Sequence, residues 1–294
     1  MAEHIIKDSQ TSEEELQQLY AEAKTEFLRQ FYADQKRLYL KGFSGRARKE
    51  RLESFRGTAD VAFLKAVCGI GFADLDLIFN IANANRDLFP QIRLGTAATV
   101  TEYLVRWIGG YFSAAANPPS KHTAKPKSSC SDPAVRKIVQ ETQELTSTEV
   151  NKAEAYHNLF MSAENIQGNL LEEYIARNVR PYGYLWCRGN ILRAIDFCSI
   201  DGADLIQIKN KDNSENSSSS NIRAGTAITK WFRLSTKHTA GIALPYYNWA
   251  DLNCLISTNR TSGHELGNCH MSEEGYLSFL KEIASANHQL ITDL

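Results

Sequence analysis

The chain has 294 residues, 43% of them hydrophobic and 23% charged, a balance that is ordinary for a soluble globular protein with a sizeable core. No apolar run approaches the roughly 18 residues that a membrane helix needs, and the polar, acidic N-terminus predicts neither a secretory signal nor a membrane partner. Six cysteines without close-paired spacing favour reduced thiols in the cytoplasm, and the net charge of −1 does not by itself indicate a nucleic-acid-binding protein.

Residues 1–112 are predicted to form a mainly helical N-terminal region. Ser12 and Glu15 make a capping box, and apolar residues follow at three- and four-residue intervals. The basic stretch 42–57 is expected to be a solvated helix face, with phosphate contact as the alternative. Further helices are expected over 59–68, 73–83 and 97–108.

Composition changes over residues 113–133, which are rich in Pro, Ser, Ala and Lys and have no periodicity, so that a linker or long loop is expected there. Residues 134–294 are predicted to form one domain. Its expected helices lie over 134–146, 148–178 and 222–233, with another that begins at Ser272. Its expected strands are three successive apolar or β-branched segments bounded by glycines, at 182–189, 191–200 and 203–211. Because two of these strands form a hairpin, the predicted fold class is α/β, a mixed β-sheet flanked by helices.

One polar constellation falls on the predicted hairpin. If the sequence SIDGA turns the chain near 201–203, Asp196 lies opposite residues 207–208. Gln207 and Lys209 are two residues apart, so they share one face of a strand while the isoleucines between them point to the core. Asp201 and Asp204 are expected to be turn residues. The sequence therefore predicts Asp196, Gln207 and Lys209 as a cluster.

These residue types suit the hydrolysis of a phosphodiester, which needs a divalent cation to activate water and a positive charge near the phosphate. Mg²⁺ prefers oxygen ligands. We expect Asp196 to hold Mg²⁺, with the Gln207 amide oxygen and the Ile208 backbone carbonyl as further ligands. Lys209 is expected to position or deprotonate the attacking water.

The segment from about residue 160 to residue 240 resembles the PD-(D/E)xK nuclease superfamily and, within it, type II restriction endonucleases of the SinI group, which cleave GGWCC. The resemblance lies in the helix GNLLEEYIARN, the strands around WCRGNILRAIDF, the tripeptide QIK and the polar loop before GTAITKWFR. It implies a restriction-endonuclease-like core, Mg²⁺, double-stranded DNA as substrate, a symmetric homodimer and a cognate DNA methyltransferase as genetic partner. It also implies a metal-ligating glutamate on the helix, at Glu172 in the pattern Gly168-x-x-x-Glu172, with Glu173 as the fallback.

The chain departs from the superfamily motif at two positions. Ile195 precedes Asp196 where the motif has proline, a loosely kept position. Gln207 stands where the motif has aspartate or glutamate, which removes one negative charge from the site. The Glu172 carboxylate would partly compensate for that loss.

Positive charge is concentrated between Lys209 and His238, a segment that contains six basic and two acidic residues. The predicted DNA contacts are Lys211, Arg223, Lys230 and Arg233, for which a solvated helix face is the alternative. The Ser/Asn-rich loop 213–221 is expected to contact phosphates or base edges, or to be merely flexible.

The cluster of Asp196, Gln207 and Lys209 is also compatible with two other functions. One is a structure-specific repair or recombination nuclease of the same fold, and the other is a non-catalytic DNA-binding protein. The simplest structural explanation of the cluster is a strand surface with a cross-strand ion pair. Structural zinc is a weaker alternative. Its candidate ligands are His264, Cys269 and His270, with Cys187 and Cys198 on strands, and no C-x-x-C pair is present.

Overall fold

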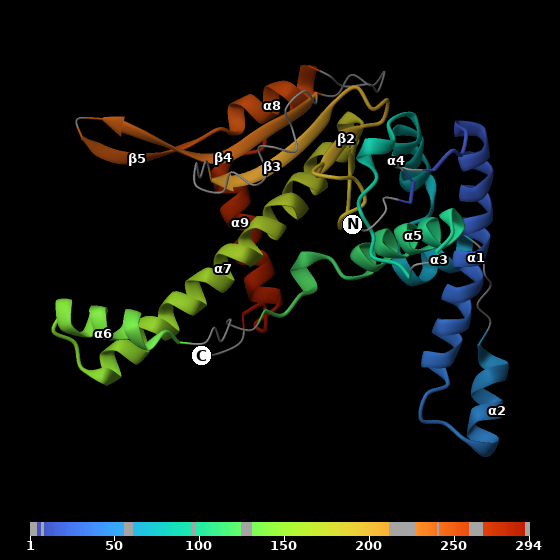
Figure 1. Ribbon diagram of the computed structural model, residues 1–294, viewed down its shortest axis with the longest axis horizontal. Coiled ribbons are helices and arrows are strands. Elements are labelled where there is room, and N and C mark those ends of the chain that lie inside the picture. The colour runs from blue at the N-terminus through green and yellow to red at the C-terminus, as the bar shows by residue number, and fades with distance from the viewer. Residues whose placement is uncertain are drawn as a thin grey trace.

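The computed structural model describes residues 5–6, 9–55, 61–95, 98–124, 131–211, 227–239, 241–258 and 267–291. Within these ranges, N-terminal helices are followed by a five-stranded sheet and further helices (Figure 1). The α-helices are α1 (Glu13–Tyr39), α2 (Gly45–Ser54), α3 (Val61–Cys68), α4 (Ala73–Ala84), α5 (Val100–Ala116), α6 (Pro133–Thr142), α7 (Ser147–Val179), α8 (Trp249–Thr258) and α9 (Glu273–Ala286). Short 3-10 helices are η1 (Arg86–Leu88), η2 (Pro119–Lys121) and η3 (Arg180–Tyr182). The strands are β1 (Tyr184–Trp186), β2 (Phe197–Ser199), β3 (Leu205–Lys211), β4 (Ile228–Thr239) and β5 (Ile242–Tyr247).

Polar caps fix where the long helices begin. The Ser12 hydroxyl accepts the N–H of Glu15 at 3.1 Å, which confirms the predicted start of α1. Thr99 and Thr146 begin α5 and α7 with full capping boxes. The helices expected near α3, α4, α6 and α9 are also confirmed, with bounds that differ by a few residues. Helix α2, in the basic stretch 42–57, buries none of its residues, as expected of a solvated helix face.

The sheet is mixed, as predicted, and its strands follow chain order from β1 to β5. Strands β1, β2 and β3 pair antiparallel, β3 and β4 pair parallel, and β4 and β5 pair antiparallel.

The helix predicted over 222–233 is wrong for the part that the structure describes, because residues 228–233 belong to β4. Along this strand Trp231 pairs with Ile208 and packs in the core beside it. Pairing with β3 and burial of alternate residues outweigh the local preference for a helix. Residues 222–226 and the predicted loop 213–221 lie outside the described ranges.

The segment expected to be a linker, 113–133, is partly helical. Helix α5 continues to Ala116, and η2 follows. Residues 125–130 lie outside the described ranges, so the predicted division of the chain at this segment stays a prediction.

The two faces of the sheet pack against different helices. Tyr184, Phe197 and Ile206 point into a core that they share with α7, α8 and α9. Their neighbours Leu185 and Cys198 point the other way, into a core built by α1, α3, α4 and α5. This alternation is what a strand buried on both faces requires. The N-terminal helices therefore cover one face of the β1–β3 end of the sheet, and α7 runs along the other (Figure 1).

Among the described residues, no helix combines the length and apolar character that crossing a membrane requires. The cysteines in the described ranges are free thiols.

Removal of the N-terminal helices is expected to prevent stable folding of the sheet. A chain of residues 131–294 would expose the Leu185 and Cys198 face of the sheet, which is fully buried in the intact protein. We expect this fragment to aggregate or to bind a hydrophobic dye, and to lack the cooperative thermal transition of the full chain. A sharp transition with native-like near-ultraviolet circular dichroism would contradict the shared core.

Candidate functional site

The β2–β3 hairpin has the register that the sequence predicts. Phe197 pairs with Ile206, and the Asp196 N–H donates to the Ile206 carbonyl at 2.9 Å, so Asp196 lies opposite Gln207. At the turn, the Asp201 carboxylate accepts the N–H of Ala203 at 3.1 Å. The turn therefore sets the register that brings the candidate residues together.

Asp204 also has a structural role at this turn. Its carboxylate accepts the Tyr184 hydroxyl at 2.8 Å. The turn itself passes close to α4, where a Cβ on Gly202 would lie 2.9 Å from the Ile81 side chain, and Gly202 has a φ of +74°. Glycine is thus required at this tip of the hairpin.

Asp196 is fixed across the hairpin by its own side chain. Its carboxylate accepts the N–H of Ile208 at 2.7 Å. The Asp196 backbone carbonyl accepts the N–H of Cys187 at 2.9 Å. These bonds link the residue to the strands on both sides, so that its carboxylate is held in place before any ligand arrives.

Gln207 is more deeply buried than a residue on a polar strand face would be, with 6% of its surface exposed. Its side-chain oxygen is buried and has no hydrogen-bond partner among the described residues. Leaving a buried carbonyl oxygen without a donor costs about 1–3 kcal/mol. An oxygen in that condition is suited to bind a cation.

Glu172 reaches the same site from α7. The Trp186 indole N–H donates to its carboxylate at 3.4 Å. Burial, and next the negative charge of Asp196, raise the pKa of Glu172 to about 8, while Trp186 and the Lys209 ammonium act in the opposite direction. The structure therefore brings Glu172, Asp196 and Lys209 into one electrostatic cluster.

The fallback residue, Glu173, does not belong to this cluster. It is buried on another side of α7, where it accepts the N–H and the hydroxyl of Ser120 at 2.9 and 2.8 Å. It also pairs with Arg177 at 2.9 Å. Because successive helix residues point about 100° apart, only one of the two glutamates can face the sheet site, and that residue is Glu172.

Two buried thiols, considered from the sequence only as zinc candidates, lie next to the carboxylates of the site. The sulfur atoms of Cys187 and Cys198 are 3.6 Å apart. Burial, followed by the neighbouring thiol and carboxylates, raises the pKa of Cys187, so this thiol stays protonated and adds no charge to the site. The two thiols therefore form an uncharged surface beside the carboxylates of Asp196 and Glu172. Period-two alternation on the two strands is the sequence signal that could have found it.

The donor set fits a hard divalent cation. It consists of the carboxylates of Glu172 and Asp196, the unsatisfied amide oxygen of Gln207 and the nearby carbonyl of Ile208, all oxygen atoms. In the part of the chain that the structure describes, no three His, Cys, Asp or Glu side chains converge as a metal site. Oxygen ligands of this kind suit Mg²⁺ and do not suit zinc.

The predicted DNA contacts have different surroundings. Lys230 on β4 pairs with Gln207 and therefore lies on the same face of the sheet as Lys209. Lys211 is exposed and makes an ion pair with Glu164 on α7 at 3.3 Å. Arg223 lies outside the described ranges.

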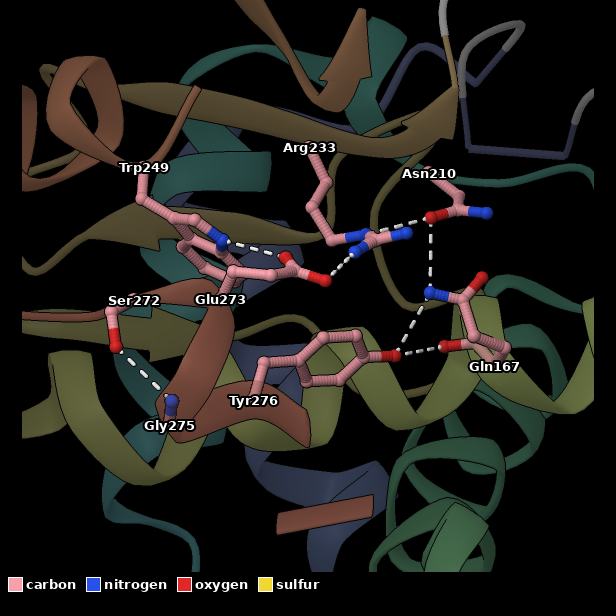
Figure 2. Close-up of polar contacts among 8 residues, drawn as sticks. All are labelled: Gln167, Asn210, Arg233, Trp249, Ser272, Glu273, Gly275 and Tyr276. Carbon is pink, nitrogen blue, oxygen red and sulfur yellow. Dashed lines mark hydrogen bonds and ion pairs between the residues drawn. The ribbon is translucent and has the colours of Figure 1, made fainter. Parts of the chain in front are cut away.

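The prediction of Arg233 as a DNA contact is wrong, because its side chain is buried. Its guanidinium pairs with Glu273 and donates to the Asn210 side-chain oxygen at 2.9 Å (Figure 2). The Trp249 indole N–H donates to the same Glu273 carboxylate at 2.9 Å. Both the predicted DNA contact and its alternative, a solvated helix face, require an exposed side chain. In the strand that forms instead, Arg233 is on the same side as the buried Trp231, so its charge needs an internal partner.

The network around Arg233 joins the sheet to three helices. Gln167 on α7 donates to the Asn210 oxygen at 3.0 Å, and the Tyr276 hydroxyl on α9 donates to the Gln167 backbone carbonyl at 2.8 Å (Figure 2). Asn210 directly follows Lys209 in β3. The network therefore holds the strand segment next to the candidate catalytic lysine.

Comparison with known proteins identifies relatives of this segment. The family model described as SinI restriction endonuclease matches residues 101–283, a range that contains every candidate site residue. The type II restriction enzyme SinI of Salmonella infantis is 39% identical over 126 residues, which cover 42% of this chain and 54% of that enzyme. The type II restriction enzyme Eco47I of Escherichia coli is 39% identical over 129 residues, 42% of this chain and 49% of that enzyme. The aligned part thus spans about half the length of these curated relatives.

Replacing Arg233 is expected to destabilise the protein strongly. Arg233→Ala leaves the Glu273 carboxylate buried without its cation, a change that typically costs about 3–5 kcal/mol. Lys230→Ala, on the same strand but only half-buried and without a carboxylate partner in the described ranges, is the matched control and should change stability by less than about 1 kcal/mol. Urea unfolding measures both. Equal stability of the two variants would contradict the structural role of Arg233.

Glu172→Gln is expected to stabilise the metal-free protein in a pH-dependent way. Folding raises the pKa of Glu172 from about 4.5 to about 8. Below about pH 4.5 the carboxyl is protonated in both the folded and the unfolded protein, so it does not affect the free energy of unfolding. As pH rises from there towards about 8, the carboxyl destabilises the wild-type folded state increasingly, because it ionises more easily in the unfolded chain. Unfolding by urea in the presence of a chelator should therefore show a gain for the variant that is larger at pH 8 than at pH 5.

The matched control is Glu164→Gln, an exposed position on the same helix, where no pH-dependent gain is expected. If Glu172→Gln raised the free energy of unfolding equally at pH 5 and pH 8, ionisation of the buried Glu172 carboxyl beside Asp196 could not be the cause of that gain.

Proposed function

Because the chain belongs to the SinI restriction endonuclease family, we propose that it is a type II restriction endonuclease, a site-specific deoxyribonuclease that hydrolyses double-stranded DNA with Mg²⁺. The observation that carries the proposal is the convergence of Glu172, Asp196 and Lys209 beside the unsatisfied Gln207 oxygen. Site-specific cleavage is the activity that the names of the two relatives describe.

The residues divide the chemistry between them. Asp196 and Glu172 would hold Mg²⁺ together with the Gln207 amide oxygen and the Ile208 carbonyl. When bound, Mg²⁺ lowers the pKa of water and offsets charge on the phosphate. The Lys209 ammonium would orient the attacking water and offset negative charge that develops on the phosphate.

Gln207 does not remove the site's need for a cation. It contributes no charge, so the negative charge comes from Glu172 and Asp196. Burial and, after it, the negative charge of Asp196 raise the pKa of Glu172, and Lys209 offsets only part of this effect. Mg²⁺ would relieve this repulsion and would supply the partner that the Gln207 oxygen lacks.

The remaining parts of the proposal follow from the family. Recognition of GGWCC, a two-fold pattern, would be met by a homodimer in which each protomer cuts one strand. A cognate DNA methyltransferase would protect host DNA, and both enzymes would act in the cytoplasm. Lys211 and Lys230 remain candidates for phosphate contact; Arg223 is proposed with them on sequence alone.

Lys209→Ala is expected to bind DNA and fail to cleave it. Wild-type protein should convert an unmodified, sequenced plasmid into discrete fragments with Mg²⁺, and sequencing of the fragment ends should return one short site. Lys211→Ala, two residues along the same strand, is the control. It should retain the single-turnover cleavage rate at saturating protein, even if its affinity falls.

Cleavage by Lys209→Ala at the wild-type rate would refute the assignment of this lysine. Asp196→Ala should also lose Mg²⁺-dependent cleavage. Nicking only at flaps or junctions would indicate a structure-specific nuclease, and intact DNA after long incubation of the wild type would indicate a non-catalytic DNA-binding protein.

A further inference from the structure

Strand β4 extends well beyond the strand that carries the candidate lysine. Among the described residues, the pairing of β4 with β3 extends to Leu234, opposite Lys211. From there to Thr239, β4 pairs with β5, whose register runs from Tyr247 to Ile242. This two-stranded segment, residues 234–247, is here called the ribbon. It projects away from the helices, at the upper left of Figure 1.

The surface of the ribbon is left open by the rest of the described chain. Every residue of β5 is exposed, including Ile242 at 62% and Leu244 at 48%. On β4, Thr236 and Lys237 are exposed as well. An exposed two-stranded ribbon is unstable alone in water and usually marks a contact with a partner.

The base of the ribbon is rigid. The Trp231 indole N–H donates to the Asn248 carbonyl at 3.0 Å. The Asn248 amide donates to the Phe232 carbonyl and to the Ser235 hydroxyl, both at 2.8 Å. Arg233, held by the network in Figure 2, lies 5.5 Å from the centre of the Tyr247 ring. These contacts fix the direction in which the ribbon leaves the sheet.

Charge distinguishes between the possible partners. The ribbon contains Lys237 and no acidic residue, and Lys230 precedes it on β4, whereas the charge of Arg233 is already paired with Glu273. A second copy of the ribbon would offer these lysines no negative charge, whereas a polyanion complements them. Lys237 is spread over the Tyr246 ring, 3.3 Å from its centre, which keeps its ammonium on the ribbon surface.

The ribbon also has the right position and length for a duplex. Lys209 pairs with Phe232, so the alternate residues Leu234 and Thr236 continue the face of the sheet that carries Lys209. Within the ribbon, Thr239 lies five residues beyond Leu234, about 17 Å at about 3.3 Å per residue. That length spans about five base pairs, and the major groove of B-DNA admits a two-stranded ribbon.

We propose that the ribbon lies in the major groove of the substrate DNA and determines its site specificity, an inference that rests on the proposed function. Thr236, on the catalytic face, contacts base edges on the groove floor. Lys237, on the opposite face, reaches only the sugar–phosphate walls. The base contact therefore carries sequence information, and the phosphate contact carries affinity for any duplex.

Two single substitutions test the two roles, in a Lys209→Ala background so that the DNA stays intact. The probes are fluorescent duplexes with and without the site obtained from plasmid fragment ends, with Mg²⁺ present, over a range of salt concentrations. Lys237→Ala should weaken binding to both duplexes by a similar factor and lower the salt slope by about one. Thr236→Ala should lose about fivefold or more of the preference for the site duplex. Lys281→Ala, an exposed lysine on α9, should change neither quantity.

Unchanged affinity, salt slope and preference in both ribbon variants would overturn the proposal, even if the wild type cuts at one site. Sedimentation velocity provides the alternative outcome: loss of a dimer in Thr236→Ala or Tyr246→Ala, with DNA preference intact, would make the ribbon an interface between copies and would also overturn it. If the wild type cuts no DNA, the proposed function fails by itself. A reduced salt slope of Lys237→Ala on any duplex would then still support the phosphate contact of the ribbon.

Discussion

The site depends on two carboxylates that share a poorly hydrated space. Glu172 and Asp196 come from different elements, and burial, followed by the negative charge of Asp196, raises the pKa of Glu172 to about 8. A single lysine, Lys209, offsets only part of that charge, and the Gln207 oxygen beside them has no donor among the described residues. An arrangement that costs stability in the free protein is typical of a site that is completed by a ligand, here one of positive charge.

The surrounding fold maintains this arrangement. The Asp201–Gly202 turn sets the register that places Asp196, and α7 carries Glu172 over the other side of the strands. The N-terminal helices cover the remaining face at the β1–β3 end. The Arg233 network then holds β3 and β4 against α7, α8 and α9 (Figure 2), so the same contacts support the lysine strand and the base of the ribbon.

Much of this could be predicted from the sequence, because strand alternation and turn residues are local signals. They gave the hairpin, the opposition of Asp196 to Gln207 and most helices. Two predictions were wrong for the same reason: the helix expected over the residues of β4, and the exposure of Arg233. The parallel pairing of β4 with β3 is a contact across a long connection, and no local pattern reports it. For the same reason the burial of Gln207 was not predicted, since it depends on which helices cover the sheet.

Binding of Mg²⁺ to the DNA-free protein, measured by isothermal titration calorimetry, tests the central claim that the crowded carboxylates form a cation site. The account predicts saturable binding to the wild type that is lost in Asp196→Asn and weakened in Glu172→Gln, with Glu164→Gln unchanged. Equal binding by the wild type and Asp196→Asn would contradict it, because the cation would then lie elsewhere.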